Sequence, residues 1–442
     1  MSLFLSFFLN LLLVFYATLL AFKVSPSFGR EVVVDGLPEG TVLPVAVGFP
    51  IFIALALRLV NSNSGVLRLR LAETLARSFV GCVGGGVLFA AGYALFTNTL
   101  FGRYVVLLTI LFSWVGTTVS YFWLAKLLAK AGRGLYFIGT ETDRASLEEV
   151  LKSQDGVFTL IAAGVTAGEQ LEPESSLRAG ALARVGISEV VVGPGVELPE
   201  AAWERLMQLP LEGVRVSNLN GFCERYFHCI FTNHLADAWF LESDMRHLHP
   251  VFNLVKRFFD VGISLTGLVF SLPFAGVIAL ALKLQDGGPV FYAQTRMGFR
   301  GRPFRIFKFR SMTTEAEKNG PQWASKGDVR VTPIGRILRR TRLDELPQFW
   351  NILRGEMSFI GPRPERVEFS RDIEREVPFF RLRSLVKPGL TGWAQVNYPY
   401  GASVEDARRK LSYDLYYIKY ASVFLDLVII LRTFIAMVKG AR

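Results

Sequence analysis

The sequence has little cysteine: only Cys82, Cys223 and Cys229 occur in 442 residues. Their number is odd and no two have CxxC spacing, so the sequence does not indicate a disulfide framework. It also lacks zinc-finger spacing, an RNP-like stretch and a basic zipper, which argues against nucleic acid as a partner. We therefore expect reduced thiols and a different anionic partner.

Basic residues are unevenly distributed along the chain. The formal net charge is +11 at pH 7. Residues 251–442 hold about 31 Lys and Arg against about 17 Asp and Glu, so this part carries roughly +14 and the remainder roughly −3. Because a basic balance implies an anionic partner, the anion-binding surface is expected in the C-terminal part. Its basic residues alternate with apolar runs, which favours phosphorylated lipids or nucleotides.

Long hydrophobic runs characterise the N-terminal part. Hydrophobic residues make up 51% of the chain. Four runs are candidate membrane helices, since a helix of roughly 20 apolar residues spans a bilayer. The first run lacks a basic leader and a cleavage site, so we expect a retained anchor and not a removed signal peptide. The runs are residues 3–24, 45–59, 78–96 and 104–128.

The charges between these runs predict their orientation. Acidic residues lie between the first and second runs, and basic residues lie between the second and third. Because cytoplasmic loops are rich in Lys and Arg, both ends of this four-span unit are expected on the cytoplasmic side. The acidic set is Glu31, Asp35 and Glu39, and the basic set is Arg58, Arg68, Arg70 and Arg77.

Short β-branched runs alternate with helical stretches in residues 132–246. This pattern predicts buried parallel strands joined by crossover helices, in a small Rossmann-like α/β domain. The first turn, GTETD, is not the GxGxxG that lets a backbone approach a pyrophosphate. A regulatory, docking or spacer role is therefore favoured over dinucleotide binding. The strands are expected at residues 134–139, 157–164, 188–195 and 213–219, and the helices at 146–153 and 201–209.

An apolar run at residues 261–282 contains a helix breaker at its centre. Pro273 removes one hydrogen bond from a helix and clashes with the preceding turn. The run is either a kinked spanning helix or a re-entrant hairpin whose ends emerge on the same side. Basic residues at both ends, Lys256 with Arg257 and then Lys283, favour the hairpin with both ends in the cytoplasm. We expect the break at Ser271 and Pro273.

A series of basic groups recurs through the polar C-terminal part. Residues 304–313, FRIFKFRSMT, alternate apolar and basic side chains as a half-buried strand does. Arg363 lies between Pro362 and Pro364, whose fixed φ presents its guanidinium on a stiff backbone, as phosphate recognition requires. An exposed arginine on an ordinary rigid turn explains the same pattern. The series is Lys308, Arg339, Arg342, Arg363 and Lys387.

The run RRTRLDELPQFW, residues 339–350, places two carboxylates among arginines. A helix over residues 333–346 is expected to end or kink at Pro347, which cannot donate to the carbonyl of Leu343. Asp344 then caps the next helix or pairs with Arg340 four residues earlier. The functional interpretation is an ionised carboxylate that the break exposes, suited to attack phosphorus. Glu345 is then placed to hold Mg²⁺.

Several motifs together carry a family resemblance over about residues 250–442. In order and spacing they resemble the bacterial sugar transferase family of polyprenyl-phosphate phosphoglycosyl transferases. The helix break in many relatives is an adjacent Ser-Pro pair, whereas Leu272 intervenes here. The segments are KRFFD, the Pro-interrupted helix, FKFRSM, RILRRTRLDELPQFWNILRGEMSFIGPRPE, KPGLTGWAQVN and YDLYYIKYASVFLDL.

The resemblance implies a monotopic catalytic domain on the cytoplasmic face of the bacterial inner membrane. Asp344 would be the nucleophile and Glu345 the Mg²⁺ ligand, with Lys308, Arg339 and Arg363 near the phosphates. The implied reaction moves sugar-1-phosphate from a UDP-sugar to polyprenyl phosphate and releases UMP. This reaction starts exopolysaccharide, capsule or O-antigen assembly.

The expected architecture is a multi-domain membrane protein. It has a four-span transmembrane domain (residues 1–131), a Rossmann-like domain (132–246) and an α/β catalytic domain with a re-entrant helix (247–442). A membrane-anchored nucleotide sensor and a scaffold for polysaccharide assembly are alternatives, but neither assigns a role to the acidic pair. The sequence leaves a homodimer open and does not identify the sugar.

Overall fold

The computed structural model describes most of the chain. The described residues are 2–24, 42–61, 71–97, 103–129, 133–152, 158–165, 186–232, 250–318, 320, 328–398, 401 and 403–438. The chain divides into two compact units, residues 1–227 and 228–442. The domain boundaries predicted near residues 131 and 246 lie outside the described residues, as do Glu31, Asp35, Glu39, Arg68 and Arg70 of the predicted loops.

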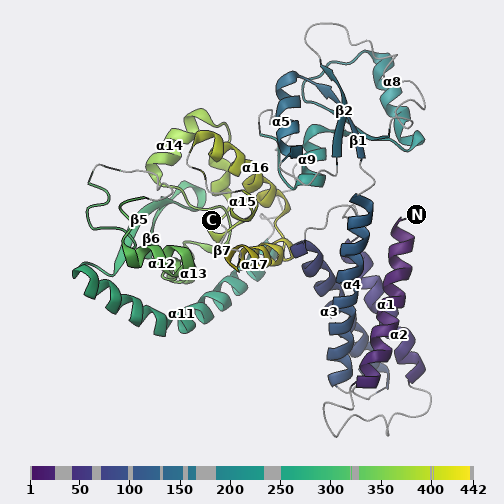
Figure 1. Cartoon of the computed structure of the whole chain (residues 1–442), viewed down its shortest axis with the longest axis horizontal. Coiled ribbons are helices and arrows are strands. Elements are labelled where there is room, and N and C mark those ends of the chain that lie inside the picture. Colours follow the sequence, from purple (N-terminus) through teal and green to yellow (C-terminus); the bar gives the residue numbers. More distant parts are fainter. Residues whose placement is uncertain are drawn as a thin grey trace. The chain divides into compact units, whose positions relative to one another are not determined.

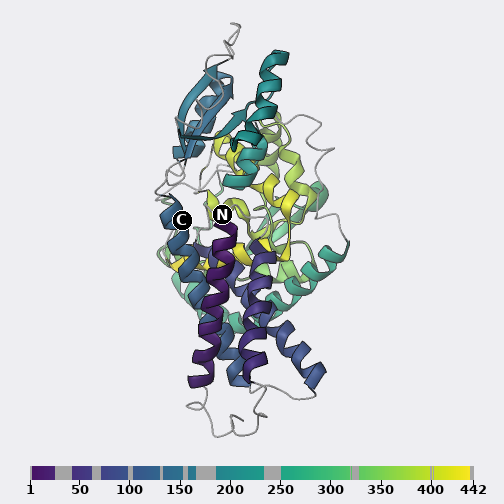
Figure 2. The same ribbon diagram turned by 90° about the vertical axis from the view of Figure 1, so that its right-hand side faces the viewer.

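The four apolar runs of the first unit each form a helix. Figures 1 and 2 both show these helices running alongside one another. Buried polar contacts join them, among which Asn10 Nδ2 donates to Tyr121 Oη at 2.6 Å and the hydroxyls of Ser78 and Thr118 lie 2.7 Å apart. Such side-chain hydrogen bonds hold helices together where water is absent. The helices are α1 (Ser2–Val24), α2 (Val42–Asn61), α3 (Leu71–Thr97) and α4 (Arg103–Ala129).

Glycines allow α3 to approach α2 closely. A Cβ at Gly85 would lie 2.6 Å from the Cα of Ile53, and a Cβ at Gly81 would lie 2.6 Å from a methyl group of Leu57. Small residues of this kind are typical of helix pairs in membranes. Large apolar side chains remain exposed on the outer faces of the helices. Examples are Leu12, Tyr16, Phe52, Leu88, Leu107 and Trp123.

Two described segments are long and apolar enough to cross a membrane, Val105–Trp123 and Pro250–Asp286. Shorter apolar segments occur at Asn10–Ala21 and Val47–Leu57. The described part of the chain is mostly helical and also contains β-sheets. Its apolar helices are consistent with membrane association.

The rest of the first unit is a four-stranded parallel sheet with strand order β2-β1-β3-β4. The four predicted strands are all present, and β3 ends three residues earlier than predicted. The helix α5 packs on β1 and β2, and α9 packs on β3 and β4. The elements are β1 (Arg133–Gly139), α5 (Glu141–Lys152), β2 (Phe158–Val165), β3 (Ile187–Val192), α8 (Glu200–Gln208), β4 (Arg215–Asn218) and α9 (Leu219–Phe227).

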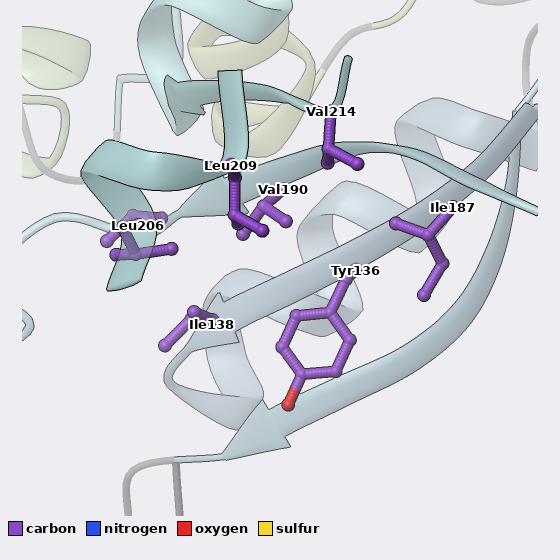
Figure 3. Close-up of a cluster of buried hydrophobic side chains, with 8 residues drawn as sticks. Tyr136, Ile138, Ile187, Val190, Leu206, Leu209 and Val214 are labelled. Carbon is purple, nitrogen blue, oxygen red and sulfur yellow. The ribbon is translucent and has the colours of Figure 1, made fainter. Parts of the chain in front are cut away.

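An apolar cluster packs against one face of this sheet (Figure 3). Tyr136 and Ile138 of β1 and Val190 of β3 meet Leu206 of α8 and the following Leu209. Tyr136, Ile138 and Val190 belong to the β-branched runs from which these strands were predicted.

The second unit surrounds two short sheets with helices. The strands β5 and β6 form an antiparallel hairpin, and β7 and β8 pair in parallel. The strand β6 begins one residue before the stretch predicted to be a half-buried strand, residues 304–313, and ends four residues before its end. The elements are α11 (Pro250–Asp286), β5 (Phe291–Met297), β6 (Pro303–Phe309), α12 (Pro333–Thr341), η5 (Leu343–Glu345), α13 (Gln348–Arg354), β7 (Ser358–Ile360), α14 (Val367–Glu376), η6 (Phe380–Leu385), β8 (Gly389–Thr391), α15 (Trp393–Asn397), α16 (Val404–Tyr420) and α17 (Val423–Val438).

Charged residues near the start of α11 attach this helix to the globular part. Arg257 donates from Nη1 to the carbonyl of Ile352 and from Nη2 to that of Leu353, both at 2.6 Å. These carbonyls lie in the last turn of α13, and that of Ile352 also accepts from the amide of the capping Gly355 at 2.9 Å. The buried carboxylate of Asp260 accepts from Ser358 Oγ at 3.0 Å and from a strand β7 amide at 2.8 Å.

The helix α11 is continuous but bends. Figure 1 shows it along one side of the second unit, curved so that both ends turn toward the globular part. Pro273 lies inside the helix and provides the physical cause of the bend. Ser271 Oγ donates to the carbonyl of Leu268 at 2.8 Å. This carbonyl is adjacent to that of Val269, which loses its helical partner to Pro273.

The outer face of α11 is apolar and exposed. Eleven large hydrophobic side chains of this helix are more than half exposed: Val251, Leu254, Phe258, Leu265, Val269, Phe270, Leu272, Phe274, Val277, Leu280 and Leu284. Exposed apolar patches of this size mark surfaces that are covered by a partner or a membrane.

We predict that Gly267→Ala weakens the attachment of α11. A Cβ at this position would lie 2.7 Å from Phe349 Cζ of α13, whereas a Cβ at Gly276 would have no atom within 4 Å. Overpacking costs about 1–3 kcal/mol, so Gly267→Ala should lower the thermal stability of the protein in detergent. Gly276→Ala, the matched control, should leave it unchanged or raise it through helix propensity. Equal effects of the two substitutions would contradict the close packing described here.

Candidate active site

Two consecutive turns position the acidic pair. The helix α12 ends at Thr341, and Arg342 adopts a left-handed conformation with φ 60°. The segment Leu343–Glu345 then forms a 3₁₀ turn, and α13 begins after Pro347. The predicted helix over residues 333–346 is therefore too long, because the break comes at Arg342. Asp344 lies within the 3₁₀ turn, so the prediction that it caps α13 is wrong.

Both carboxylates of the pair are buried. Asp344 is 5% exposed and Glu345 is 7% exposed. The expectation that the helix break exposes Asp344 is also wrong. The 3₁₀ turn directs both side chains inward, toward β6 and the segment 361–364. Neighbouring cations reach the pair from these two segments.

Glu345 is held by cations at one of its two oxygens. Lys308 Nζ lies 3.0 Å and Arg363 Nη2 lies 2.8 Å from Glu345 Oε1. Arg342 Nη1 lies 3.9 Å from the same atom. Burial by itself raises the pKa of Glu345, but Lys308 and Arg363 outweigh it and hold the pKa well below its ordinary value. Glu345 is therefore ionised.

Asp344 differs from its neighbour in its contacts. Among the described residues, none donates a hydrogen bond to the Asp344 carboxylate. Burial raises the pKa of Asp344 above its ordinary value, Lys308 opposes this shift, and the charge of Glu345 adds to it. Arg339, in the last turn of α12, is close enough to oppose it as well. The result is a buried carboxylate that lies near cations but accepts no hydrogen bond from the described side chains.

Lys308 belongs to β6, whose position is fixed by a buried amide. Asn351 of α13 is fully buried, accepts from the Phe307 amide at 3.1 Å and donates to the Arg305 carbonyl at 2.7 Å. These bonds bind β6 to the helix that follows the acidic pair. Burial lowers the pKa of Lys308, and the charge of Glu345 opposes this change.

A second ion pair supports the turn that carries Arg363. Arg383 Nη2 donates to the Arg363 carbonyl at 3.0 Å and pairs with the buried carboxylate of Asp414 at 2.8 Å. Burial raises the pKa of Asp414 to about 6, although Arg383 lowers it. Sequence reasoning did not identify Arg383 or Asp414, because their contact joins residues 31 positions apart with no local signal.

The structure brings four of the predicted residues together and separates others. Lys308, Arg363, Asp344 and Glu345 converge, and Arg339 lies nearby. Lys387 does not join them: its pKa is lowered by burial and by the charge of Arg257, near the start of α11. Ser271 and Pro273 lie in α11 and contribute no contact to the acidic pair.

Further arginines near the site were also missed. Arg366 donates from Nη1 to Glu317 Oε1 at 2.9 Å, and Tyr292 Oη donates to the same oxygen at 2.8 Å. Arg296 donates to the carbonyl of Pro364 at 3.2 Å and is buried, which lowers its pKa. The sequence pointed to these arginines only through the excess of basic residues in this part of the chain.

The described residues alone do not complete a metal site here. Among the described residues, no three His, Cys, Asp or Glu side chains come together as a metal site. The cations of the described residues contact Glu345 at Oε1, which leaves Oε2 and the Asp344 carboxylate without a cation contact from these residues. One or two carboxylates completed by phosphate oxygens are a common setting for Mg²⁺.

Comparison with known proteins identifies the family. Residues 251–440, which include every residue of this site, match the family described as Bacterial sugar transferase. A Rhizobium leguminosarum protein named exopolysaccharide production protein PSS is 39% identical over 189 residues, 41% of this chain and 94% of that protein. The chain belongs to the bacterial sugar transferase family. This confirms the resemblance seen in the sequence motifs.

Two other members of the family are also similar. A putative undecaprenyl-phosphate N-acetylgalactosaminyl 1-phosphate transferase of Bacillus subtilis is 48% identical over 129 residues, 29% of this chain and 72% of that protein. A UDP-N-acetylgalactosamine-undecaprenyl-phosphate N-acetylgalactosaminephosphotransferase of Aeromonas hydrophila is 43% identical over 241 residues, 54% of this chain. The match spans 56% of the Aeromonas protein, little more than half of its length.

The different contacts of the two carboxylates predict opposite effects on stability. Glu345→Gln leaves the buried charges of Lys308 and Arg363 without their partner, so we expect a loss of about 2–4 kcal/mol in the free energy of unfolding. Asp344→Asn removes a buried charge that lacks a direct partner, so it should be neutral or stabilising. Thermal unfolding in detergent measures both.

The exposed residue Glu368, whose carboxylate lies 3.8 Å from Arg366, provides a control. Glu368→Gln should change stability by less than about 0.5 kcal/mol. A loss for Asp344→Asn as large as that for Glu345→Gln would show that the two carboxylates are held alike.

Proposed function

We propose that this protein transfers sugar-1-phosphate from a UDP-sugar to polyprenyl phosphate and so starts the synthesis of an exopolysaccharide, capsule or O-antigen. The observation that carries the proposal is the contrast within the acidic pair. Glu345 is fixed by two cations, while the Asp344 carboxylate beside it has no hydrogen bond among the described residues. A nucleophile needs such an unengaged oxygen.

In the first step, an oxygen of Asp344 attacks the sugar-bearing phosphorus of the UDP-sugar. The bond from this phosphorus to the bridging oxygen breaks, and UMP leaves with the electron pair. An acyl phosphate that carries the sugar remains on Asp344. Lys308 and Arg363 lie where they stabilise the phosphoryl oxygens, which is the main catalytic requirement of such a transfer.

In the second step, a phosphate oxygen of polyprenyl phosphate attacks the same phosphorus. The bond between the phosphorus and Asp344 breaks, the carboxylate is regenerated, and polyprenyl-diphospho-sugar is released. The bond between the sugar and its oxygen is not broken in either step. The anomeric configuration of the sugar is therefore retained.

The open oxygens of the acidic pair suit Mg²⁺. Glu345 Oε2, with or without Asp344, would hold the ion together with phosphate oxygens of the donor. When bound, Mg²⁺ would neutralise charge on the diphosphate. The surrounding cations of the chain, Lys308, Arg363 and Arg342, orient the same diphosphate from the other side.

The apolar helices suggest where the reaction takes place. We place α1 to α4 across the inner membrane and α11 within its cytoplasmic leaflet as a re-entrant helix bent at Pro273. The charged residues of α17 are paired inward, Asp426 with Lys256 at 2.8 Å and Arg432 over the ring of Trp393, which suits an interfacial helix. Polyprenyl phosphate then reaches the site from the bilayer, and the UDP-sugar reaches it from the cytoplasm.

A nucleotide sensor and a polysaccharide-assembly scaffold explain less of the chain. Neither requires a buried acidic pair surrounded by cations, which lies in the part that matches the family. The parallel sheet of the first unit is assigned a regulatory, docking or spacer role. We propose that residues 1–131, 132–246 and 247–442 act as separate domains for anchoring, regulation and catalysis.

We predict that Asp344→Asn abolishes UMP release from UDP-sugars in the presence of polyprenyl phosphate and Mg²⁺. Asparagine preserves the shape of the side chain but is not a nucleophile, so a loss on the order of a thousandfold or more is expected. A panel of UDP-sugars, assayed for UMP, identifies the donor. Turnover of the variant near the wild-type rate would contradict the assignment of Asp344 as the nucleophile.

The membrane arrangement of α11 can be tested by cysteine labelling. In a protein with Cys82, Cys223 and Cys229 replaced by serine, single cysteines at Val251 and Leu284 should both react only from the cytoplasmic side. These positions lie near the two ends of α11 and are 72% and 78% exposed. A re-entrant helix returns both ends to the side they left.

A cysteine at Asp35 provides the control, because the loop between the first two helices is predicted to be periplasmic. It should react with reagent added from outside. Labelling of Val251→Cys and Leu284→Cys from opposite sides would mean that Pro273 only kinks a spanning helix.

A further inference from the structure

A short segment that precedes the matched part of the chain packs inside the second unit. It consists of residues 228–230 and directly follows Phe227, the last residue of α9. The family match begins only at residue 251. The Rhizobium protein is matched over 94% of its length within 189 residues, which leaves that relative little chain for such a segment. Residues 228–230 therefore lie outside the part that the family shares.

Hydrogen bonds and aromatic contacts fix this segment on α15 and α16. His228 has φ 53°, in the left-handed region that residues other than glycine rarely adopt. Its carbonyl accepts from Trp393 Nε1 at 2.8 Å, and its ring meets the rings of Trp393 and Tyr416 edge-on. The Ile230 amide donates to the carbonyl of Ser412 in α16 at 3.0 Å. A strained backbone of this kind persists only where its surroundings determine it.

The Ile230 side chain fills the core between α14, η6 and α16. It is fully buried in a cluster to which each of these elements contributes. Phe380, the first residue of η6, belongs to this cluster and carries the guanidinium of Arg383 over its ring, 4.8 Å from the centroid. Removing atoms from such a core leaves a cavity that the neighbouring elements close only in part. The other members are Ile373, Val377, Ala407, Leu411, Leu415 and Ile418.

Arg383 connects this core to the acidic pair. The helix α16 that binds the Ile230 amide also carries Asp414, which pairs with Arg383 Nη2 at 2.8 Å. The same Nη2 atom donates to the Arg363 carbonyl at 3.0 Å, and Arg363 Nη2 donates to Glu345 Oε1 at 2.8 Å. A shift of η6 or α16 therefore moves the cation that is bound to Glu345.

We propose that residues 228–230 are a positioning segment for the active site. They fix η6 and α16 and so, through Arg383, hold Arg363 at the acidic pair. The inference rests on the proposed function for its effect on the rate, because Arg363 acts there on the phosphoryl oxygens. The segment adds to the catalytic unit a support that comes from outside the residues matched to the family.

The first test shortens the Ile230 side chain in the full-length protein. Ile230→Ala should lower kcat for UMP release about tenfold, because a misplaced catalytic group costs up to about a hundredfold. Ile230→Val leaves a much smaller cavity and should restore kcat to within about twofold of the wild type. Ile138→Ala is the matched control, since Ile138 is 1% exposed in the core of the first unit. It should leave kcat unchanged.

A double substitution shows whether Ile230 acts through Arg383. Arg383→Lys keeps a charge beside Asp414 but loses the fork that also reaches the Arg363 carbonyl. If both residues act along one connection, Ile230→Ala should lower kcat by less than about twofold in the Arg383→Lys protein. A merely destabilised protein would lose active molecules in either background. Multiplied losses would therefore overturn the proposal.

Hydrogen exchange tests the packing without an assay of turnover. In Ile230→Ala, the amides of Phe380 and Leu382 at η6 should exchange about tenfold faster, because local opening there becomes easier. The Phe307 amide, bonded to Asn351, is the internal control and should keep its rate. Equal acceleration at all three amides, or none at η6, would overturn the proposal. Faster exchange confined to η6 supports it even if no UDP-sugar is turned over, a result that would count against the transfer reaction alone.

Discussion

The site depends on the ion pairs that meet at one oxygen of Glu345. Lys308 comes from β6, Arg363 from a proline-flanked turn and Glu345 from a 3₁₀ turn, so three separate segments are joined at one atom. In a buried setting these attractions are screened far less than at the surface. They keep Glu345 ionised and place positive charge beside Asp344 without occupying its carboxylate. Two adjacent acids can therefore take different roles.

Features set by local sequence patterns were predicted well. The strands of the first unit follow from β-branched runs bounded by glycine, and the apolar helices follow from their length and composition. The break between α12 and α13 was also expected, but at Pro347. The structure breaks the helix at Arg342, whose left-handed conformation no residue type indicates. This earlier turn moves Asp344 from a capping position to a buried one.

Features set by long-range contacts were not predicted. Lys387 was grouped with Lys308 and Arg363 on charge alone, yet it lies near Arg257. The reverse holds for Arg383, which the sequence gives no reason to select and which supports the Arg363 backbone. Basic composition predicted an anionic partner for this part of the chain. It could not show which cations face the anion, because that depends on pairs distant in sequence.

The short helix α13 connects the apolar helix to the reaction site. Its last carbonyls bind Arg257, and its Phe349 ring packs against Gly267, so both contacts hold α11. Its first residue follows the acidic pair within one turn, and its Asn351 fixes the strand that carries Lys308. The helix α13 thus sets the distance between the exposed apolar face of α11 and Asp344. Such an arrangement suits a reaction whose one substrate is dissolved in water and whose other substrate is anchored in lipid.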